Sequence, residues 1–145
     1  MTMNEEVMDA LHSILKQTNN ATRDYHKAAE AVGSLSLKIF LEDQIVQRSE
    51  FMSTLARQIE DSGIRSIHEG KVHSTWMDMN TAISLGSEAA IIRECIRGEK
   101  AARDEYEKLL KCDLSETGDA KKLLTDQLIR GRQVINRLEV MQTIK

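Results

Sequence analysis

One apolar stripe constrains the fold of this chain more than any other feature of its sequence. The stripe recurs at alternating steps of four and three residues along a predicted helix over residues 5–32, and it never slips. Its members are Val7, Leu11, Ile14, Thr18, Ala21, Tyr25, Ala28 and Val32. A strict 3.5-residue period is typical of long helices packed nearly parallel. The absence of proline and the 3% aromatic content also favour an all-α fold, so we expect a helical bundle.

Three further long helices are predicted over about residues 36–62, 88–112 and 120–141. Short links between the first two helices and between the last two predict two antiparallel hairpins. The middle link, residues 63–86, is long enough to return along the whole bundle, and Trp76, Met79, Asn80 and Ile83 mark a short amphipathic helix within it. The second and third helices should therefore be parallel. The expected fold is all-α, a single ferritin-like four-helix-bundle domain over residues 1–145 with one long crossover.

The charge balance and the cysteine positions exclude several classes of function. A net charge of −3 offers no general attraction to nucleic acid or to an anionic membrane. No apolar run approaches the roughly 20 residues of a membrane span, and the first nine residues are acidic where a signal peptide would be basic. Cys95 and Cys112 lie about 25 Å apart on one predicted helix, too far for a disulfide between them. We expect a cytoplasmic protein with free thiols.

A carboxylate interrupts the apolar stripe of the third long helix at its middle, at Glu99. One interpretation displaces the stripe by one residue and leaves Glu99 at the surface. The other buries Glu99 in a polar core layer with Arg48 as its charge partner and Gln44 and Gln127 beside them, because a lone buried carboxylate is costly. Such a layer can fix the register of helix pairing. The stripe consists of Ile92, Cys95, Glu99, Ala102, Tyr106 and Leu109.

Residues near this layer have simple structural interpretations. Gly98 and Gly131 would be points where helices approach closely. Tyr25 and Tyr106 would pack in the core, with each hydroxyl reaching a polar group. Neither interpretation requires a catalytic role for these side chains.

The sequence lacks the ligand pattern of a di-metal centre in a four-helix bundle. That pattern takes a Glu from each of two helices and a Glu-x-x-His from each of the other two. No Glu in this chain has a His three residues further on, and the histidines lie in the first helix (His12, His26) or in the crossover (His68, His73). Arg48 would add positive charge where the metals would sit. We therefore expect no catalytic, cofactor-binding or metal-ligating residue, and no cofactor.

Three stretches of the sequence resemble a known family. They are "DYHKAAEAV" at residues 24–32, "HSTWMDM" at residues 73–79 and "ECIRGEKAARDEY" at residues 94–106. In these stretches the chain resembles the bacterial ferritin-like group called domain of unknown function family 2383, and the resemblance covers nearly the whole chain. It implies a ferritin-like fold and kinship with di-iron proteins, but no activity.

Three hypotheses about function remain open. The first is a non-enzymatic ferritin-like bundle that acts as an interaction or stress-associated module, through self-association as a homo-oligomer or with a protein partner of unknown identity. The second is a metal-dependent oxidase or iron-storage protein with an unusual site near Glu99. The third is a binder of small apolar ligands that uses the bundle core or the cleft under the Trp76 helix. The missing histidines weigh against the second.

Overall fold

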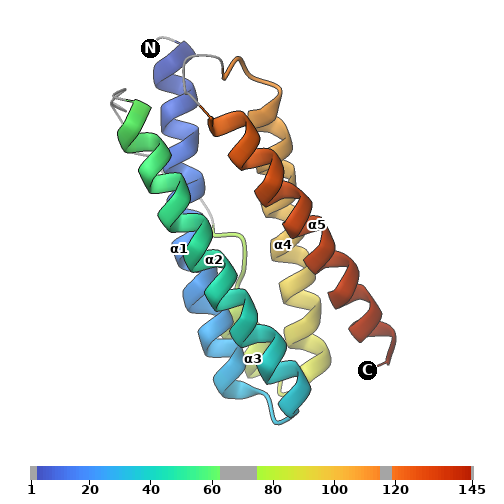
Figure 1. Cartoon of the computed structure of the whole chain (residues 1–145). Coiled ribbons are helices and arrows are strands. Elements are labelled where there is room, and N and C mark those ends of the chain that lie inside the picture. Colours follow the sequence, from blue (N-terminus) through green and yellow to red (C-terminus); the bar gives the residue numbers. More distant parts are fainter. Residues whose placement is uncertain (1–2, 63–74, 115–118, 145) are drawn as a thin grey trace.

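The computed structural model describes residues 3–62, 75–114 and 119–144, and every regular element in these ranges is an α-helix (Figure 1). The expected all-α fold is confirmed, and the ends of the long helices lie within three residues of the predicted ones. The helices are α1 (Met3–Ala31), α2 (Leu35–Ser62), α3 (Met79–Ser84), α4 (Glu88–Leu110) and α5 (Ala120–Ile144).

The four long helices form two antiparallel hairpins that pack against each other (Figure 1). Within the hairpins α1 pairs with α2 and α4 pairs with α5, while between them α1 lies beside α4 and α2 lies beside α5. Helices α2 and α4 therefore occupy a diagonal of the bundle, and they run in the same direction. Residues 63–74 of the connection between them, with His68 and His73, lie outside the described residues, so the path of the crossover stays a prediction.

The interior consists of two apolar clusters with polar side chains between them. The α1 stripe is buried along its whole length, from Val7 to Val32, as its heptad spacing predicts. One cluster fills each end of the bundle, and each fully buried Leu or Ile contributes roughly 1.5–3 kcal/mol. The buried polar residues between the clusters include Thr18, Gln44, Arg48, Glu99 and Gln127.

The start of α4 ties the two hairpins together. Ser87 is the N-cap of α4, and its hydroxyl accepts a hydrogen bond from the Ala90 N–H at 3.1 Å. One carboxylate oxygen of Glu88 accepts hydrogen bonds from the backbone N–H groups of Gly33 and Ser34, both at 2.9 Å. The first turn of α4 therefore holds the turn between α1 and α2.

None of the helices in the described part of the chain combines the length and the apolarity that a membrane span requires.

Candidate functional site

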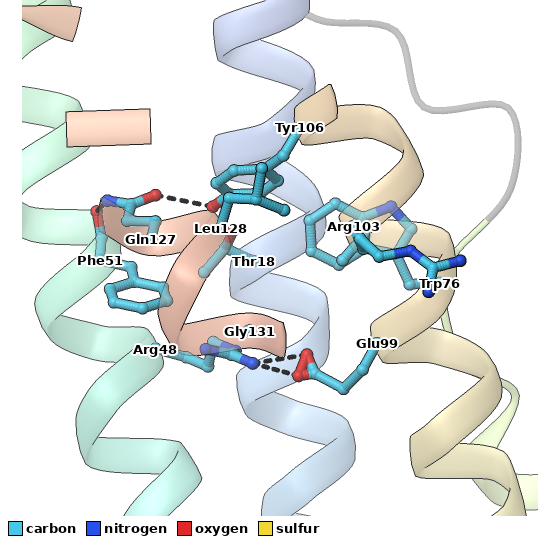
Figure 2. Close-up of a pocket in the computed structure, with 11 residues that line it drawn as sticks. Thr18, Arg48, Phe51, Trp76, Glu99, Arg103, Tyr106, Gln127, Leu128 and Gly131 are labelled. Atoms are coloured by element: carbon cyan, nitrogen blue, oxygen red, sulfur yellow. Dashed lines mark hydrogen bonds and ion pairs between the residues drawn. The ribbon is translucent and has the colours of Figure 1, made fainter. Parts of the chain in front are cut away.

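An ion pair between Arg48 and Glu99 crosses the middle of the bundle (Figure 2). Arg48 comes from α2 and Glu99 from α4, so the pair spans the diagonal and both side chains are almost fully buried. Nη2 of Arg48 donates to both carboxylate oxygens of Glu99, and Nη1 donates to Oε1 of Gln47 at 3.0 Å. The guanidinium also packs over the Phe51 ring, 5.0 Å from its centroid. The structure therefore places Glu99 in the core and not at the surface.

The charges of this pair compensate each other. Burial by itself would lower the pKa of Arg48, but the charge of Glu99 and its hydrogen bonds, together with Tyr25 and Tyr106, outweigh burial and raise that pKa above its usual value. An arginine in this position keeps its positive charge at any physiological pH. The layer thus holds a permanent cation at the centre of the bundle, where a metal ion would meet electrostatic repulsion.

A second polar network is centred on Tyr106, which follows Glu99 by seven residues, or about two helical turns, on α4. The Tyr106 hydroxyl donates to Oε1 of Gln127 at 2.7 Å (Figure 2). Nε2 of Gln127 donates to the Phe51 carbonyl oxygen and to the Thr54 hydroxyl, both at 3.4 Å. The network joins α4, α5 and α2, so Gln127 belongs to the buried polar set but bonds Tyr106 and not the ion pair.

Gln44 and Tyr25 have fewer polar partners than the sequence predicts. Nε2 of Gln44 donates to the Phe40 carbonyl oxygen of its own helix at 3.4 Å, and its Oε1 has no hydrogen-bond partner among the described residues. The Tyr25 hydroxyl is near enough to Glu99 for the carboxylate to raise its pKa, yet it makes no hydrogen bond of normal geometry. The expectation that each tyrosine hydroxyl reaches a polar group is therefore confirmed for Tyr106, whereas the Tyr25 hydroxyl lies near the Glu99 carboxylate without a hydrogen bond of normal geometry.

Gly98 has a different neighbour from the one expected. A Cβ atom at this position would overlap Cγ of Met77 and lie 3.0 Å from the Trp76 carbonyl oxygen. The close approach is thus between α4 and the segment that precedes α3, not between two long helices. At Gly131 an added Cβ would meet nothing within 4 Å, so the prediction of a close helix approach there is wrong.

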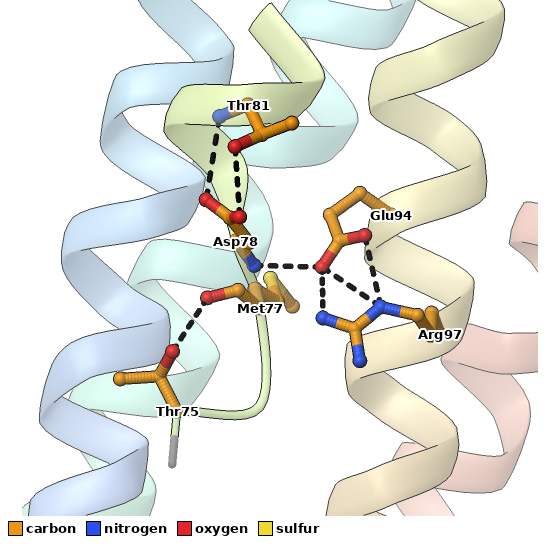
Figure 3. A network of polar contacts seen from close by, with 6 residues as sticks. All are labelled: Thr75, Met77, Asp78, Thr81, Glu94 and Arg97. Carbon is orange, nitrogen blue, oxygen red and sulfur yellow. Dashed lines mark hydrogen bonds and ion pairs between the residues drawn. The ribbon is translucent and has the colours of Figure 1, made fainter.

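Polar contacts hold the segment before α3 in this position (Figure 3). The Asp78 backbone N–H donates to Glu94 of α4 at 2.7 Å, and Glu94 also forms an ion pair with Arg97. The Asp78 side chain caps α3 and accepts from the Thr81 N–H at 3.3 Å and from its hydroxyl at 2.8 Å. Trp76 is buried as a result, at 5% exposure.

The titratable side chains around the ion pair stay protonated at neutral pH. Burial, followed by the charge of Glu99, raises the pKa of the Tyr25 hydroxyl and of the Cys95 thiol. Burial also raises the pKa of Tyr106. The pKa of each of these three groups is raised, which is the opposite of the shift that activates a nucleophile. Within the described ranges, no group of three or more His, Cys, Asp or Glu side chains is placed to hold a metal ion.

The layer contains a small cavity of about 20 Å³, lined in part by Arg48, Trp76, Glu99 and Tyr106 (Figure 2). Such a volume accommodates about one water molecule, whereas sites for small organic ligands occupy roughly 300–1,000 Å³. The indole N–H of Trp76 is buried without a partner among the described residues, so a water molecule has a donor to bind there.

Sequence reasoning missed three of these features. It did not pair Tyr106 with Gln127, did not place Trp76 and Met77 on Gly98, and did not connect Asp78 to Glu94. The Gly98 contact carried a detectable signal, because a glycine in the interior of a long helix costs about 1 kcal/mol and needs a packing reason. The other two contacts are long-range and leave no periodic trace.

One comparison with known proteins gives a match. A family model described as "Domain of unknown function (DUF2383)" matches residues 6–112, which include most of α1 and all of α2, α3 and α4. Neither the curated proteins nor the solved structures give a match.

Proposed function

Because the chain belongs to the domain of unknown function family 2383, whose description assigns no activity, we propose a function from the geometry of the bundle. We propose that the protein is a non-enzymatic, ferritin-like four-helix bundle of the cytoplasm that works through its surface as an interaction protein. In this proposal the level of the bundle that holds metal in di-iron relatives of the fold is filled by a structural ion pair.

One observation carries the proposal: the buried contact of Arg48 with Glu99. A di-metal centre needs several carboxylates and imidazoles that converge on a space free of positive charge. Here the one inward carboxylate of the layer is already neutralised, and the guanidinium occupies the space next to it. The charge balance of the layer is complete without a metal ion.

Metal content and iron oxidation test this proposal. The full chain, purified from cells supplied with iron, manganese and zinc, should contain far less than one equivalent of each metal by elemental analysis. It should oxidise ferrous iron no faster than buffer. Two metal ions per chain that disappear in Glu99→Gln would place a metal centre in the layer and overturn the proposal.

A groove of about 650 Å³ keeps the binding of small apolar ligands as a second candidate function. It lies between the first half of α1 and the end of α4, with Val7, Ala10, Ile14 and Leu109 among its lining residues. That volume is typical of ligand sites, unlike the cavity in the layer. A neutral fluorescent probe such as N-phenylnaphthylamine should bind the wild type and not Ala10→Arg if this candidate is right. Equal fluorescence with both proteins would rule the groove out.

A further inference from the structure

The apolar side chains left at the surface are concentrated on two neighbouring helices. Among the residues that the structure describes, seven large aliphatic side chains are exposed, and six of them belong to α2 and α5. Their exposed fractions run from 47% to 78%. The set, here named the α2/α5 face, consists of Leu35, Ile39, Val46, Ile129, Val140 and Ile144.

The spacing within each helix places these residues on the side away from the core. Ile39 lies four residues after Leu35, and Val46 lies seven residues after Ile39, which returns the helix to the same side each time. On α5, Val140 and Ile144 are separated by four residues. Each helix therefore has a second apolar stripe, opposite the one that it buries.

Contacts between α2 and α5 fix the height of the two outer stripes relative to each other. Glu50 of α2 forms an ion pair with Arg130 of α5 at 4.0 Å, and the two helices are antiparallel. Leu35 lies fifteen residues before Glu50 on α2, and Ile144 lies fourteen residues after Arg130 on α5. These two aliphatic side chains therefore lie at the same level, at the end of the bundle where α2 starts and α5 ends (Figure 1).

The same counting places Ile39 level with Val140. They lie eleven residues before Glu50 and ten residues after Arg130. The Arg137 guanidinium packs over the Phe40 ring, 4.7 Å from its centroid, which confirms that these parts of α5 and α2 are level. The aliphatic residues thus form level pairs, one from each helix.

Two exposed charges on each helix are opposite in sign at matching heights, among other exposed charges that include Lys38 and Arg57 on α2 and Asp126 and Glu139 on α5. The exposed acidic side chains Asp43 and Glu50 lie between and beyond the aliphatic residues of α2. On α5, the exposed Arg130 and Arg137 lie at the corresponding levels. At these two heights α2 presents an acidic side chain and α5 presents a basic one, so this part of the surface is complementary to itself.

We propose that a second copy of this chain docks on the α2/α5 face and forms a two-fold symmetric dimer whose axis is parallel to the bundle. Rotation about such an axis keeps every residue at its height and puts α2 opposite the partner's α5. Leu35 then meets the partner's Ile144, and Ile39 meets the partner's Val140. Asp43 and Glu50 lie opposite the partner's Arg137 and the partner's Arg130, and each contact occurs twice.

The dimensions of the face predict the strength of this dimer. The contact extends over about 24 Å of helix and is about two helix diameters, or 20 Å, wide. It would bury about 500 Å² of each copy, or about 1,000 Å² in total, at the lower limit for specific interfaces. We therefore expect a dimer that dissociates in the micromolar range. The inference refines the proposed function by naming its partner, and its tests do not depend on metal content.

Sedimentation velocity of the full chain across about 1–200 μM tests the proposal. The wild type should shift from monomer to dimer, and Ile39→Lys should weaken the dimer about tenfold or more. Leu85→Lys is the matched control, because Leu85 is the seventh exposed aliphatic residue but lies at the end of α3, off the α2/α5 face. A wild type that stays monomeric at 200 μM, or equal weakening by both substitutions, would overturn the proposal.

A charge exchange tests the orientation. One variant carries Asp43→Lys with Glu50→Lys, and the other carries Arg130→Glu with Arg137→Glu. Each variant alone should associate at least tenfold more weakly than the wild type, because like charges face each other in both halves of the interface. An equimolar mixture should recover a heterodimer, because reversed α2 then meets reversed α5 and native α5 meets native α2. A mixture as weak as its components would show that α2 and the partner's α5 do not meet.

Discussion

The middle of the bundle and the α2/α5 face combine charged and apolar groups in opposite ways. In the middle, one arginine and one carboxylate are enclosed by two apolar clusters and neutralise each other. On the face, isolated aliphatic side chains are surrounded by exposed charges. The same residue types therefore have different energetic weights, since desolvation magnifies a charge in the core and solvent screens it at the surface.

The buried ion pair helps to specify the fold, whereas the α2/α5 face is available for contact with another molecule. The buried pair can join only one residue of α2 to one residue of α4, so it fixes how the hairpins align. The α2/α5 face exposes aliphatic side chains and solvated charges, and their exposure lowers the stability of the monomer only slightly. Substitutions in the middle should therefore change stability, and those on the face should change association.

The largest effect is expected from removing the cation alone. Arg48→Leu leaves Glu99 buried without its partner and should lower the free energy of unfolding by about 3–5 kcal/mol. Arg130→Leu is the control, because the exposed Arg130–Glu50 pair contributes at most about 1 kcal/mol. Urea denaturation followed by circular dichroism measures both. Similar losses of unfolding free energy in the two variants would mean that the buried ion pair stabilises the protein no more than the exposed one.

Two glycines near the layer should respond in opposite directions. Gly98→Ala forces Met77 and the Trp76 carbonyl to move and should destabilise the protein by about 1–3 kcal/mol. Gly131→Ala meets no neighbour and should stabilise α5 by about 0.5–1 kcal/mol. Thermal denaturation of the two variants checks the contrast. A stable Gly98→Ala would mean that the segment before α3 does not pack on α4.

The two buried tyrosines provide a smaller contrast. Tyr106→Phe removes the donor to Gln127 and leaves its Oε1 unsatisfied, at a cost of about 1–2 kcal/mol. Tyr25→Phe removes a hydroxyl with no hydrogen bond of normal geometry and should change stability by less than about 0.5 kcal/mol. Equilibrium unfolding of both variants at one pH distinguishes them. A larger loss for Tyr25→Phe would show that the Tyr25 hydroxyl forms a stabilising hydrogen bond, with the nearby Glu99 carboxylate as the candidate acceptor.

The smallest effect is expected at Asp24, which is half-buried and so intermediate between the two regions. Burial, opposed by Lys27 and reinforced by Asp78 and Glu94, raises the pKa of Asp24 from 3.8 to about 6. Because the folded state holds this proton more tightly than the unfolded state, Asp24 favours folding below pH 4 and loses that contribution as pH rises through 6.

Asp24→Asn should therefore be more stable relative to wild type at pH 7.5 than at pH 4. The gain should be under about 1 kcal/mol, because solvent screens a half-exposed carboxyl. Unfolding of both proteins at the two pH values gives the difference directly. A gain that is the same at both values would contradict the raised pKa.

Periodicity explains why the sequence was informative about some parts of the fold. The α1 stripe and the α4 stripe carry a 3.5-residue period, which predicts these two helices and their buried faces and leaves an inward and a surface position open for Glu99. Arg48 can be matched with Glu99 because it is the charged residue in the heptad stripe of α2, which consists of Leu37, Leu41, Gln44, Arg48, Phe51, Leu55 and Ile59. Both inferences depend only on local spacing.

Other features depend on where distant segments meet. The contact of Met77 with Gly98 joins an irregular segment to a helix, and no period links them. Gly131 looked equivalent to Gly98 in the sequence, yet it faces no neighbour within 4 Å. Tyr106 bonds Gln127 only at one rotation of α5 about its own axis. A heptad pattern does not define that rotation closely enough to predict the pair.

A double-mutant cycle at Arg48 and Glu99 measures whether the two buried charges stabilise the fold as a pair. Denaturation midpoints and slopes would be measured for Arg48→Leu, Glu99→Met and the double variant. If the pair is a structural device, the double variant should recover most of the stability that Arg48→Leu loses, with a coupling energy above about 1.5 kcal/mol. Losses that add to within about 0.5 kcal/mol would show that the two charges do not depend on each other and would contradict the account.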